Sequence, residues 1–278
     1  MNLPDDLQRQ VDVALEEDIG SGDITASLIP AKRRATARVL CRDAAVICGQ
    51  PWFNTCFKSF DPGVTIQWQV DEGSHVEADT LLCILEGSAR SLLTVERTAL
   101  NFLQTLSGVA TETRRHVDAI GDLPTRILDT RKTLPGLRTA EKYAVSCGGG
   151  KNHRIGLFDA MLIKENHIFS VGSITQAVTE GRTRYPDKPI EVETENLQEL
   201  KEALEAGADI IMLDNYSLED IYKAVEITGG RAKLEVSGNV TLATLRELAE
   251  TGVDYISIGA LTKHVQAIDL SMRISLEG

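Results

Sequence analysis

The sequence predicts an α/β protein, an incomplete β/α barrel preceded by an N-terminal α+β sandwich domain. From residue 125 onward, short apolar runs alternate with amphipathic helical segments, a pattern that favours a parallel sheet. The ends of these runs, from Lys164 to Gly259, lie 29, 21, 23 and 22 residues apart. Such even spacing suits a barrel better than a doubly wound sheet. Only six runs are clear, so a complete eight-stranded barrel is not supported.

The part before residue 125 has the pattern of a mixed domain. Helical spacing covers Pro4–Asp18, with Pro4 suited to a first turn. Strands are expected at 35–41, 45–48 and 64–70, and the last of these alternates apolar and polar residues. Residues 71–87 resemble the repeat unit of lipoyl and biotinyl carrier domains, but no Met-Lys turn follows. We interpret them as part of a structural sandwich.

A longer helix is expected over Ser91–Ser107, with Gly108 ending it. Its residues Arg97, Asn101 and Gln104 form one polar stripe, since they fall at positions i, i+4 and i+7. Periodicity alone indicates a solvated face for this stripe.

The second part contains the strands and helices of the predicted barrel. Six strand-like runs are expected at 126–128, 160–163, 190–192, 210–213, 233–236 and 255–258. Helices with the 3.6-residue period are expected at 197–206, 218–227 and 242–251.

Composition excludes several classes of protein. The net charge of −12 argues against a nucleic-acid binder, and the apolar runs are too short to span a membrane. The N-terminus lacks the basic and apolar regions of a secretory signal. Five scattered cysteines without a C-x-x-C pair fit a reducing, cytoplasmic location and indicate neither disulfides nor a zinc site. The histidines show no metal-binding spacing, so no metal held by the protein alone is expected.

One stretch departs from the acidic character of the chain. From Arg126 to Lys164, eight Lys and Arg stand against three Asp and Glu, a local balance of +5. A basic stretch is usually a solvated face, but these residues flank apolar strands in an acidic chain. The stretch therefore indicates an anion-binding site.

Polar or flexible residues follow every predicted barrel strand. In a β/α barrel all these points meet at one mouth, where active sites lie. Arginines there suit carboxylates, and carboxylates suit ribose hydroxyls or a hydrated Mg²⁺ on a pyrophosphate. Gly-rich turns offer backbone N–H groups to a phosphate. The strand-end residues in this reading are Arg131, Lys132, Arg154, Lys164, Glu193, Asp214, Ser237, Gly238, Asn239, Gly259 and Ala260.

Six ordered motifs carry a resemblance to the quinolinate phosphoribosyltransferases, also called carboxylating nicotinate-nucleotide pyrophosphorylases. The resemblance runs nearly from end to end of the chain, and the matched positions show no departure. The motifs lie at Glu17–Thr25, Glu96–Phe102, Asp129–Thr133, Gly150–Arg154, Ile163–His167 and Ser257–Thr262.

The resemblance implies an organisation and an activity. Residues 1–108 would form the sandwich domain with dimer contacts, 109–265 the catalytic barrel, and 266–278 a return to the sandwich. The activity would be phosphoribosyl transfer from phosphoribosyl pyrophosphate to quinolinate with decarboxylation, giving nicotinate mononucleotide in NAD biosynthesis. Mg²⁺ would enter with the pyrophosphate, near Glu193 and Asp214. The chain would form a homodimer or an assembly of dimers, with Arg97 in the partner's site.

The resemblance also assigns roles to residues. Catalytic roles would fall on Lys132, Lys164, Glu193 and Asp214. Quinolinate contacts would fall on Arg97, Arg131, His153, Arg154 and Lys164. Phosphoribosyl pyrophosphate contacts would fall on Lys132, Lys164, Glu193, Asp214, Ser237, Gly238, Asn239, Ile258, Gly259 and Ala260. Thr130 and, from the partner chain, Lys263 complete the substrate-binding set.

Three alternatives stay open. A related pyrophosphorylase acting on another carboxylated heterocycle would share the motifs. Lys164 at a strand end could be the Schiff-base lysine of a barrel lyase. The carrier-like segment could belong to a binding module without catalytic activity. His167 is as well explained by packing or surface exposure as by function.

Overall fold

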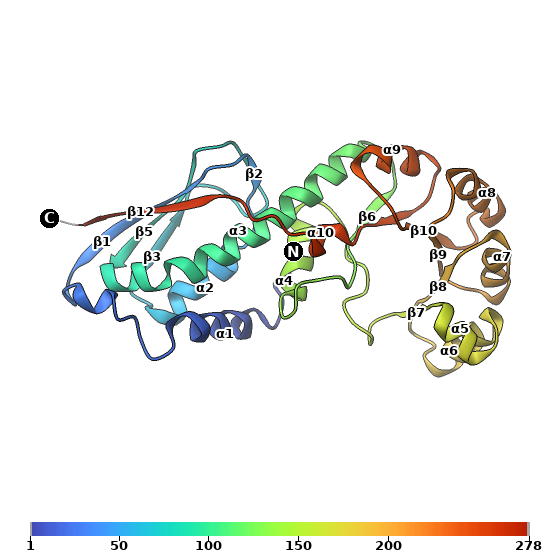
Figure 1. Cartoon of the computed structure of the whole chain (residues 1–278), viewed down its shortest axis with the longest axis horizontal. Coiled ribbons are helices and arrows are strands. Elements are labelled where there is room, and N and C mark those ends of the chain that lie inside the picture. Colours follow the sequence, from blue (N-terminus) through green and yellow to red (C-terminus); the bar gives the residue numbers. More distant parts are fainter. Residues whose placement is uncertain (1, 277–278) are drawn as a thin grey trace. The chain divides into compact units, whose positions relative to one another are not determined.

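The computed structural model describes residues 2–276, and backbone contacts divide the chain into two compact units (Figure 1). The first unit contains the residues up to Arg114, Thr133–Gly149 and the residues from Leu261 onward. The second contains Arg115–Lys132 and Gly150–Ala260. Boundaries were expected at residues 108 and 265. Residues 133–149, expected in the barrel domain, belong to the first unit.

The first unit is built on an antiparallel sheet with the strand order β12-β1-β5-β3. These strands are β1 (Arg34–Cys41), β3 (Thr65–Trp68), β5 (Thr80–Ser88) and β12 (Leu270–Leu276). A small second sheet pairs β2 (Ala45–Val46) with β4 (His75–Val76). Every second residue of β1 is buried, which fits a sheet that packs one face on the core. In β3, Thr65 and Gln67 are exposed while Ile66 and Trp68 are half-buried, and this confirms the predicted alternation.

Helices complete this unit and fill its core. They are α1 (Leu7–Ile19), the 3-10 turn η1 (Ala26–Leu28), α2 (Gln50–Phe60) and α4 (Arg138–Cys147), with the short α10 (Ala260–Lys263) at the division between the units. The first helix begins after Asp6, so Pro4 precedes it and is not part of its first turn as expected. The aromatic residues Trp52, Phe53 and Phe57 of α2 are fully buried. They anchor this core, because large aromatic side chains bury the most apolar area.

The long helix α3 corrects one expectation about Gly108. It covers Ala89–Ile120 and continues through Gly108, which was expected to end it. A Cβ atom at this position would lie 2.1 Å from the backbone oxygen of Gln266. Gly108 therefore allows a neighbouring segment to approach the helix closely and does not act as a stop. Glycine inside a helix costs about 0.5–1 kcal/mol relative to alanine, and here the close contact offsets that cost.

The second unit is a six-stranded parallel sheet with the order β6-β11-β10-β9-β8-β7. The strands are β6 (Arg126–Leu128), β7 (Met161–Ile163), β8 (Ile190–Thr194), β9 (Ile210–Asp214), β10 (Lys233–Ser237) and β11 (Tyr255–Ser257). The helices are α5 (Glu165–Val171), α6 (Ile174–Arg184), α7 (Leu197–Ala206), α8 (Leu218–Thr228) and α9 (Leu242–Glu250), and Figure 1 shows α6 to α9 on the outer side of the strands.

This strand order is that of a barrel opened at one place. β7 to β11 follow one another across the sheet, and β6 then pairs with β11. Within residues 115–260, β6 and β7 are the two edges of the sheet. Lys151 makes a one-residue parallel bridge to Leu128 and so partly covers the β6 edge. The predicted incomplete β/α barrel with six strands is confirmed.

None of the helices among residues 2–276 combines the length and the apolar character that crossing a bilayer requires.

Candidate active site at the mouth of the open barrel

The register of the strands decides which side chains share the inner face of the sheet. Glu193 of β8 pairs with Met212 of β9, which pairs with Glu235 of β10. In the same way Asp214 pairs with Ser237. Because successive side chains of a strand point to opposite faces, the residues between them point the other way. Those residues, Val192, Ile211, Leu213, Leu234 and Val236, are all buried and apolar. The sheet therefore has an apolar face and a face rich in charged and polar groups.

At the end of β7, Lys164 and Glu193 form an ion pair between Nζ and Oε2. The Lys164 side chain is 41% exposed and that of Glu193 14%. The backbone N–H of Lys164 donates to Nδ1 of His167 at 3.0 Å. His167 thus satisfies a backbone donor at the start of α5, which is a capping role.

The residues that follow β6 are Thr130, Arg131 and Lys132, and the first and last of them lie against the loop after β11. Thr130 Oγ1 accepts the backbone N–H of Lys132 at 3.0 Å. A Cβ atom at Gly259 would lie 2.9 Å from Cδ of Lys132 and 3.5 Å from Oγ1 of Thr130. The N–H of Ile258 donates to the carbonyl of Leu128 at 2.9 Å. Gly259 therefore lets the 258–260 loop lie directly against the Lys132 side chain.

A buried carboxylate holds the loop that carries His153 and Arg154. Asp129 is fully buried, and its two oxygens accept from Nδ2 of Asn152 at 2.7 Å and from the N–H of His153 at 2.9 Å. Arg154 Nη1 donates to the carbonyl of Ala160 at 3.3 Å. Burial lowers the pKa of Arg154, and the positive charge of Arg131 lowers it further. Two arginines that repel each other in this way favour an anion between them.

Hydrogen bonds connect the loop after β9 with the loop after β10. The N–H of Asn215 donates to the carbonyl of Ser237 at 3.0 Å, and Asn239 Nδ2 donates to Asn215 Oδ1 at 3.1 Å. Asn215 Nδ2 also donates to Asp214 at 2.9 Å. Asn215, Gly238 and Asn239 have φ values of 54°, 94° and 49°. Successive backbone N–H groups in such left-handed turns form anion-binding concavities.

Two buried carboxylates were missed in the sequence analysis. Glu191 is 4% exposed and Glu235 is fully buried. Nε2 of His153 lies 2.9 Å from Oε2 of Glu191 and 3.6 Å from Oε2 of Glu235. Burial raises the pKa of Glu235 to about 8, and the negative charge of Glu191 acts in the same direction. The sequence feature that could have indicated them is a glutamate flanked by apolar residues in each of two strands, Ile190-Glu191-Val192 and Leu234-Glu235-Val236.

Arg97 and Lys263 are the predicted site residues that belong to the first unit. Both are exposed in the chain. Arg97 lies in the first third of α3, and Lys263 is the last residue of α10. The other predicted site residues lie in the second unit. They either follow its strands or belong to the 152–154 loop.

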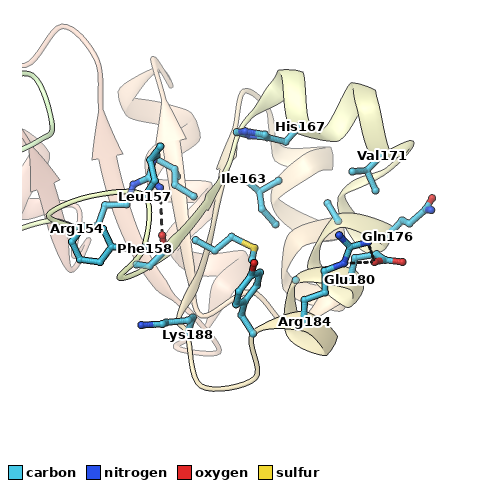
Figure 2. Close-up of a pocket in the computed structure, with 16 residues that line it drawn as sticks. Arg154, Leu157, Phe158, Ile163, His167, Val171, Gln176, Glu180, Arg184 and Lys188 are labelled. Atoms are coloured by element: carbon cyan, nitrogen blue, oxygen red, sulfur yellow. Dashed lines mark hydrogen bonds and ion pairs between the residues drawn. The ribbon is translucent and has the colours of Figure 1, made fainter.

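A cavity of about 850 Å³ lies at the β7 edge of the sheet (Figure 2). Arg154 lines it together with apolar side chains that include Leu157, Phe158 and Met161. Lys164, Glu193 and Asp214 are not among the residues that line this cavity, whereas Arg154 and His167 are.

The sheet and the chemistry of its strand ends define the class of protein: an α/β-barrel enzyme whose mouth suits small molecules with several negative charges. Family models agree with this class. The model of the quinolinate phosphoribosyl transferase C-terminal domain matches residues 109–273, and that of the N-terminal domain matches residues 23–107. The chain therefore belongs to the quinolinate phosphoribosyltransferase family.

Individual relatives and structures agree with this assignment. A probable carboxylating nicotinate-nucleotide pyrophosphorylase of Synechocystis is 46% identical over 264 residues, which cover 94% of this chain and 90% of the relative. The corresponding probable enzyme of Bacillus subtilis is 40% identical over 261 residues, covering 94% and 90%. The structure of the nicotinate-nucleotide pyrophosphorylase from Francisella tularensis is 49% identical, with a TM-score of 0.95 over 99% of this chain and 98% of that one.

Proposed function

We propose that this enzyme transfers the phosphoribosyl group of phosphoribosyl pyrophosphate to the ring nitrogen of quinolinate and releases CO₂, giving nicotinate mononucleotide and pyrophosphate. The observation that carries the proposal is the order of charge around the sheet. Arginines stand after β6 and in the 152–154 loop, the Lys164–Glu193 pair and Asp214 stand at the ends of β7 to β9, and glycine turns follow β10 and β11. A dicarboxylate ring and a phosphorylated sugar need these groups side by side.

Quinolinate carries two carboxylates, and Arg131 and Arg154 would bind them. The planar guanidinium group pairs with a carboxylate through two parallel hydrogen bonds. A dicarboxylate would also relieve the repulsion that lowers the pKa of Arg154. Lys164 would then contact the ring carboxylate while it remains paired with Glu193.

The sugar and its phosphates would lie over the later strands. Glu193 and Asp214 would accept from the ribose hydroxyls, and their negative charge would stabilise the oxocarbenium character that develops at C1 as pyrophosphate leaves. Lys132 and the 237–239 and 258–260 loops would bind the phosphates, with Thr130 keeping Lys132 in place through its backbone. The ring nitrogen attacks C1, and the cationic ring then accepts the electron pair released as the adjacent carboxylate leaves as CO₂. A solvent proton replaces that carboxylate on the ring carbon.

We propose Mg²⁺ as the cofactor that enters with phosphoribosyl pyrophosphate. Glu193 and Asp214 supply the carboxylate oxygens that Mg²⁺ prefers. Among residues 2–276, they are not part of a cluster of three converging protein ligands. The two residues therefore suit a hydrated ion whose other ligands are pyrophosphate oxygens. When bound, Mg²⁺ would neutralise the charge of the leaving group.

We also propose a homodimer, or an assembly of dimers, in which each site uses residues of two chains. Support comes from the family resemblance and from the exposed position of Arg97 on the polar stripe of α3. Arg97, and with it Lys263, would reach the quinolinate and phosphate groups bound by the partner chain. The site is then shared reciprocally across a two-fold axis.

The decisive assay uses the purified chain with Mg²⁺, phosphoribosyl pyrophosphate and quinolinate labelled at the carboxylate next to nitrogen. We expect nicotinate mononucleotide and labelled CO₂ in equal amounts. Arg131→Ala should abolish most of this activity, whereas Arg126→Ala is the matched control, because Arg126 is an exposed arginine at the opposite end of the same strand. Product formation without CO₂ release, or only with another heterocycle, would refute the assigned substrate.

A further inference from the structure

Three side chains with metal-binding atoms converge inside the first unit. The Sγ atoms of Cys48 and Cys147 and a carboxylate oxygen of Glu72 all lie within 4.8 Å of one another. Both cysteines are buried, and Glu72 is half-buried. The proposed reaction uses none of the three. Because they stand far apart in the sequence, no spacing motif indicates this cluster, and the sequence analysis expected no zinc site.

Hydrogen bonds from neighbouring groups hold two of these residues in place. Glu72 lies in the turn between β3 and β4, and its two oxygens accept the backbone N–H groups of Gly49 at 2.8 Å and Gln50 at 3.1 Å. Cys48 precedes α2, and the hydroxyl of Ser107 accepts its N–H at 2.9 Å and donates to its carbonyl at 3.1 Å. Partners of this kind orient metal ligands, so the cluster is prepared for an ion.

The helix α4 supplies a fourth group. Cys147 is its last residue, and Tyr143 stands one turn earlier on the same face. The Tyr143 hydroxyl hydrogen-bonds to Glu72 and to Cys147. Two sulfurs and two oxygens are thus gathered in one place, which is the number of ligands in a closed zinc site. The end of α4 also favours a cation, because a helix C-terminus carries a partial negative charge.

The spacing and the charge of the cluster suit one divalent ion. Sulfur at about 2.3 Å and oxygen at about 2.1 Å from a tetrahedral Zn²⁺ stand about 3.5–3.8 Å apart, so the side chains need to close by only about 1 Å. Two thiolates and one carboxylate bring three negative charges, of which the ion neutralises two. The backbone N–H groups at the start of α2, which already face Glu72, compensate for the remainder.

We propose that Cys48, Glu72 and Cys147 form a structural binding site for one thiophilic divalent cation of the Zn²⁺ class. The phenol oxygen of Tyr143 is the fourth ligand. Thiolate sulfur selects such ions over Mg²⁺, and the two thiols release their protons to solvent when the ion binds. The ion would join the start of α2 to the end of α4, from which the chain continues through three glycines to the 152–154 loop.

Two other uses of the thiols are less well supported. A disulfide between Cys48 and Cys147 would need an oxidant to reach residues that are 0% and 5% exposed, and both cysteines are free thiols. Thiols that only hydrogen-bond to Glu72 would need no ion. A thiol is a weak donor, however, so two thiols compensate for little of the charge of a carboxylate removed from water.

The test adds Zn²⁺ or Co²⁺ to the full chain after chelator treatment, with the thiols kept reduced. We expect one Zn²⁺ per chain and a melting temperature that rises with zinc concentration. Co²⁺ should give the near-ultraviolet absorption band of thiolate-to-metal charge transfer. The other group with metal-binding spacing in residues 2–276, His153 with Glu191 and Glu235, contains no sulfur and cannot give this band.

Three variants assign the band to residues. Cys48→Ala and Cys147→Ala should each lose both the band and the stabilisation by zinc. Cys83→Ala is the matched control, because Cys83 is a fully buried cysteine of β5 in the same unit and belongs to neither group. It should keep both properties.

Absence of the charge-transfer band in the reduced wild-type chain would overturn the proposal, and this measurement needs no variant. A band that persists in both Cys48→Ala and Cys147→Ala, or that is lost equally in Cys83→Ala, would also overturn it. An intact mass lower by two hydrogens, together with no zinc uptake after reduction, would assign the sulfurs to a disulfide instead. Metal content and spectrum are read without substrate, so the result does not depend on the proposed function.

Discussion

Replacing Gly238 with alanine tests whether the loop after β10 is shaped by its contact with the neighbouring loop. Gly238 has a φ of 94°, which an L-residue adopts at a cost of about 1–2 kcal/mol. In addition, the new Cβ would lie 2.2 Å from Oδ1 of Asn215. Asn215 must then rotate away and lose its hydrogen bonds to Asn239 and Asp214. At roughly 1 kcal/mol or less for each exposed bond, the total cost is about 1–4 kcal/mol.

Gly207→Ala is the matched control. Gly207 has a φ of 82°, but a Cβ there would meet nothing within 4 Å. Gly207→Ala should therefore lose only the backbone cost of about 1–2 kcal/mol in unfolding free energy. The additional loss in Gly238→Ala measures the contact between the two loops. Because the proposed phosphate-binding turn includes Gly238, only Gly238→Ala should also raise KM for phosphoribosyl pyrophosphate, by about tenfold.

Denaturant unfolding gives the free energy of unfolding for both variants, and steady-state kinetics with each substrate varied gives the two KM values. The reasoning is refuted if the variants lose the same stability and keep the same KM values. It is also refuted if KM for quinolinate rises as much as KM for phosphoribosyl pyrophosphate, since the loop would then not be specific to the phosphate side.

Four further outcomes are expected. Arg131→Ala and Arg154→Ala should each weaken quinolinate binding by about 2–5 kcal/mol if the carboxylate pair is desolvated, and calorimetric titration that finds unchanged affinity in both would exclude this pocket. Inactive Arg97→Ala and Arg154→Ala chains, mixed and allowed to exchange subunits, should recover about a quarter of wild-type activity through one intact site in each mixed dimer; no recovery after verified exchange would leave Arg97 outside the site. Gly108→Ala should lower the free energy of unfolding by about 2–3 kcal/mol through the clash with neighbouring backbone, whereas a gain would mean that only helix propensity matters there. The pKa of Glu235, raised from 4.5 to about 8, means that the folded chain keeps a proton that the unfolded chain releases, so stability should fall as pH rises through this interval and the fall should be smaller in Glu235→Gln.

Much of the barrel could be predicted because the apolar runs and helical periodicities that indicate its strands and helices are local features of the sequence. The helix expected at 197–206 is α7 with the same bounds, and each expected barrel strand matches an observed one within a residue or two at either end. Short runs of three or four mainly apolar residues indicate buried parallel strands, and the residues after each run lie at the carboxyl end of its strand. For that reason the amino-acid sequence alone was enough to place Lys164, Glu193, Asp214 and Ser237 at the carboxyl ends of their strands.

What the sequence did not predict depends on contacts distant along the chain. Gly108 looked like a helix stop, and only the approach of Gln266 explains why a glycine stands inside α3. Glu191 and Glu235 looked like ordinary strand residues, because nothing local shows that two strands bring them to one histidine. The left-handed turns at Asn215 and Asn239 likewise follow from the link between their loops. The proposed roles of Arg97 and Lys263 in a partner's site stay predictions.

The pairing of β1 with β12 has a consequence for how the chain is made on the ribosome. Ala35 lies opposite Leu276 in this pair. One edge of β1 therefore has no partner strand until β12 has been translated. At about 5–20 residues per second this delay is roughly 12–48 s. During that time the nascent chain exposes an unpaired strand edge, which is a template for association with other chains. Ribosome-bound chains stalled before residue 270 should therefore bind holding chaperones through the β1 segment, and release of the finished chain should end that binding.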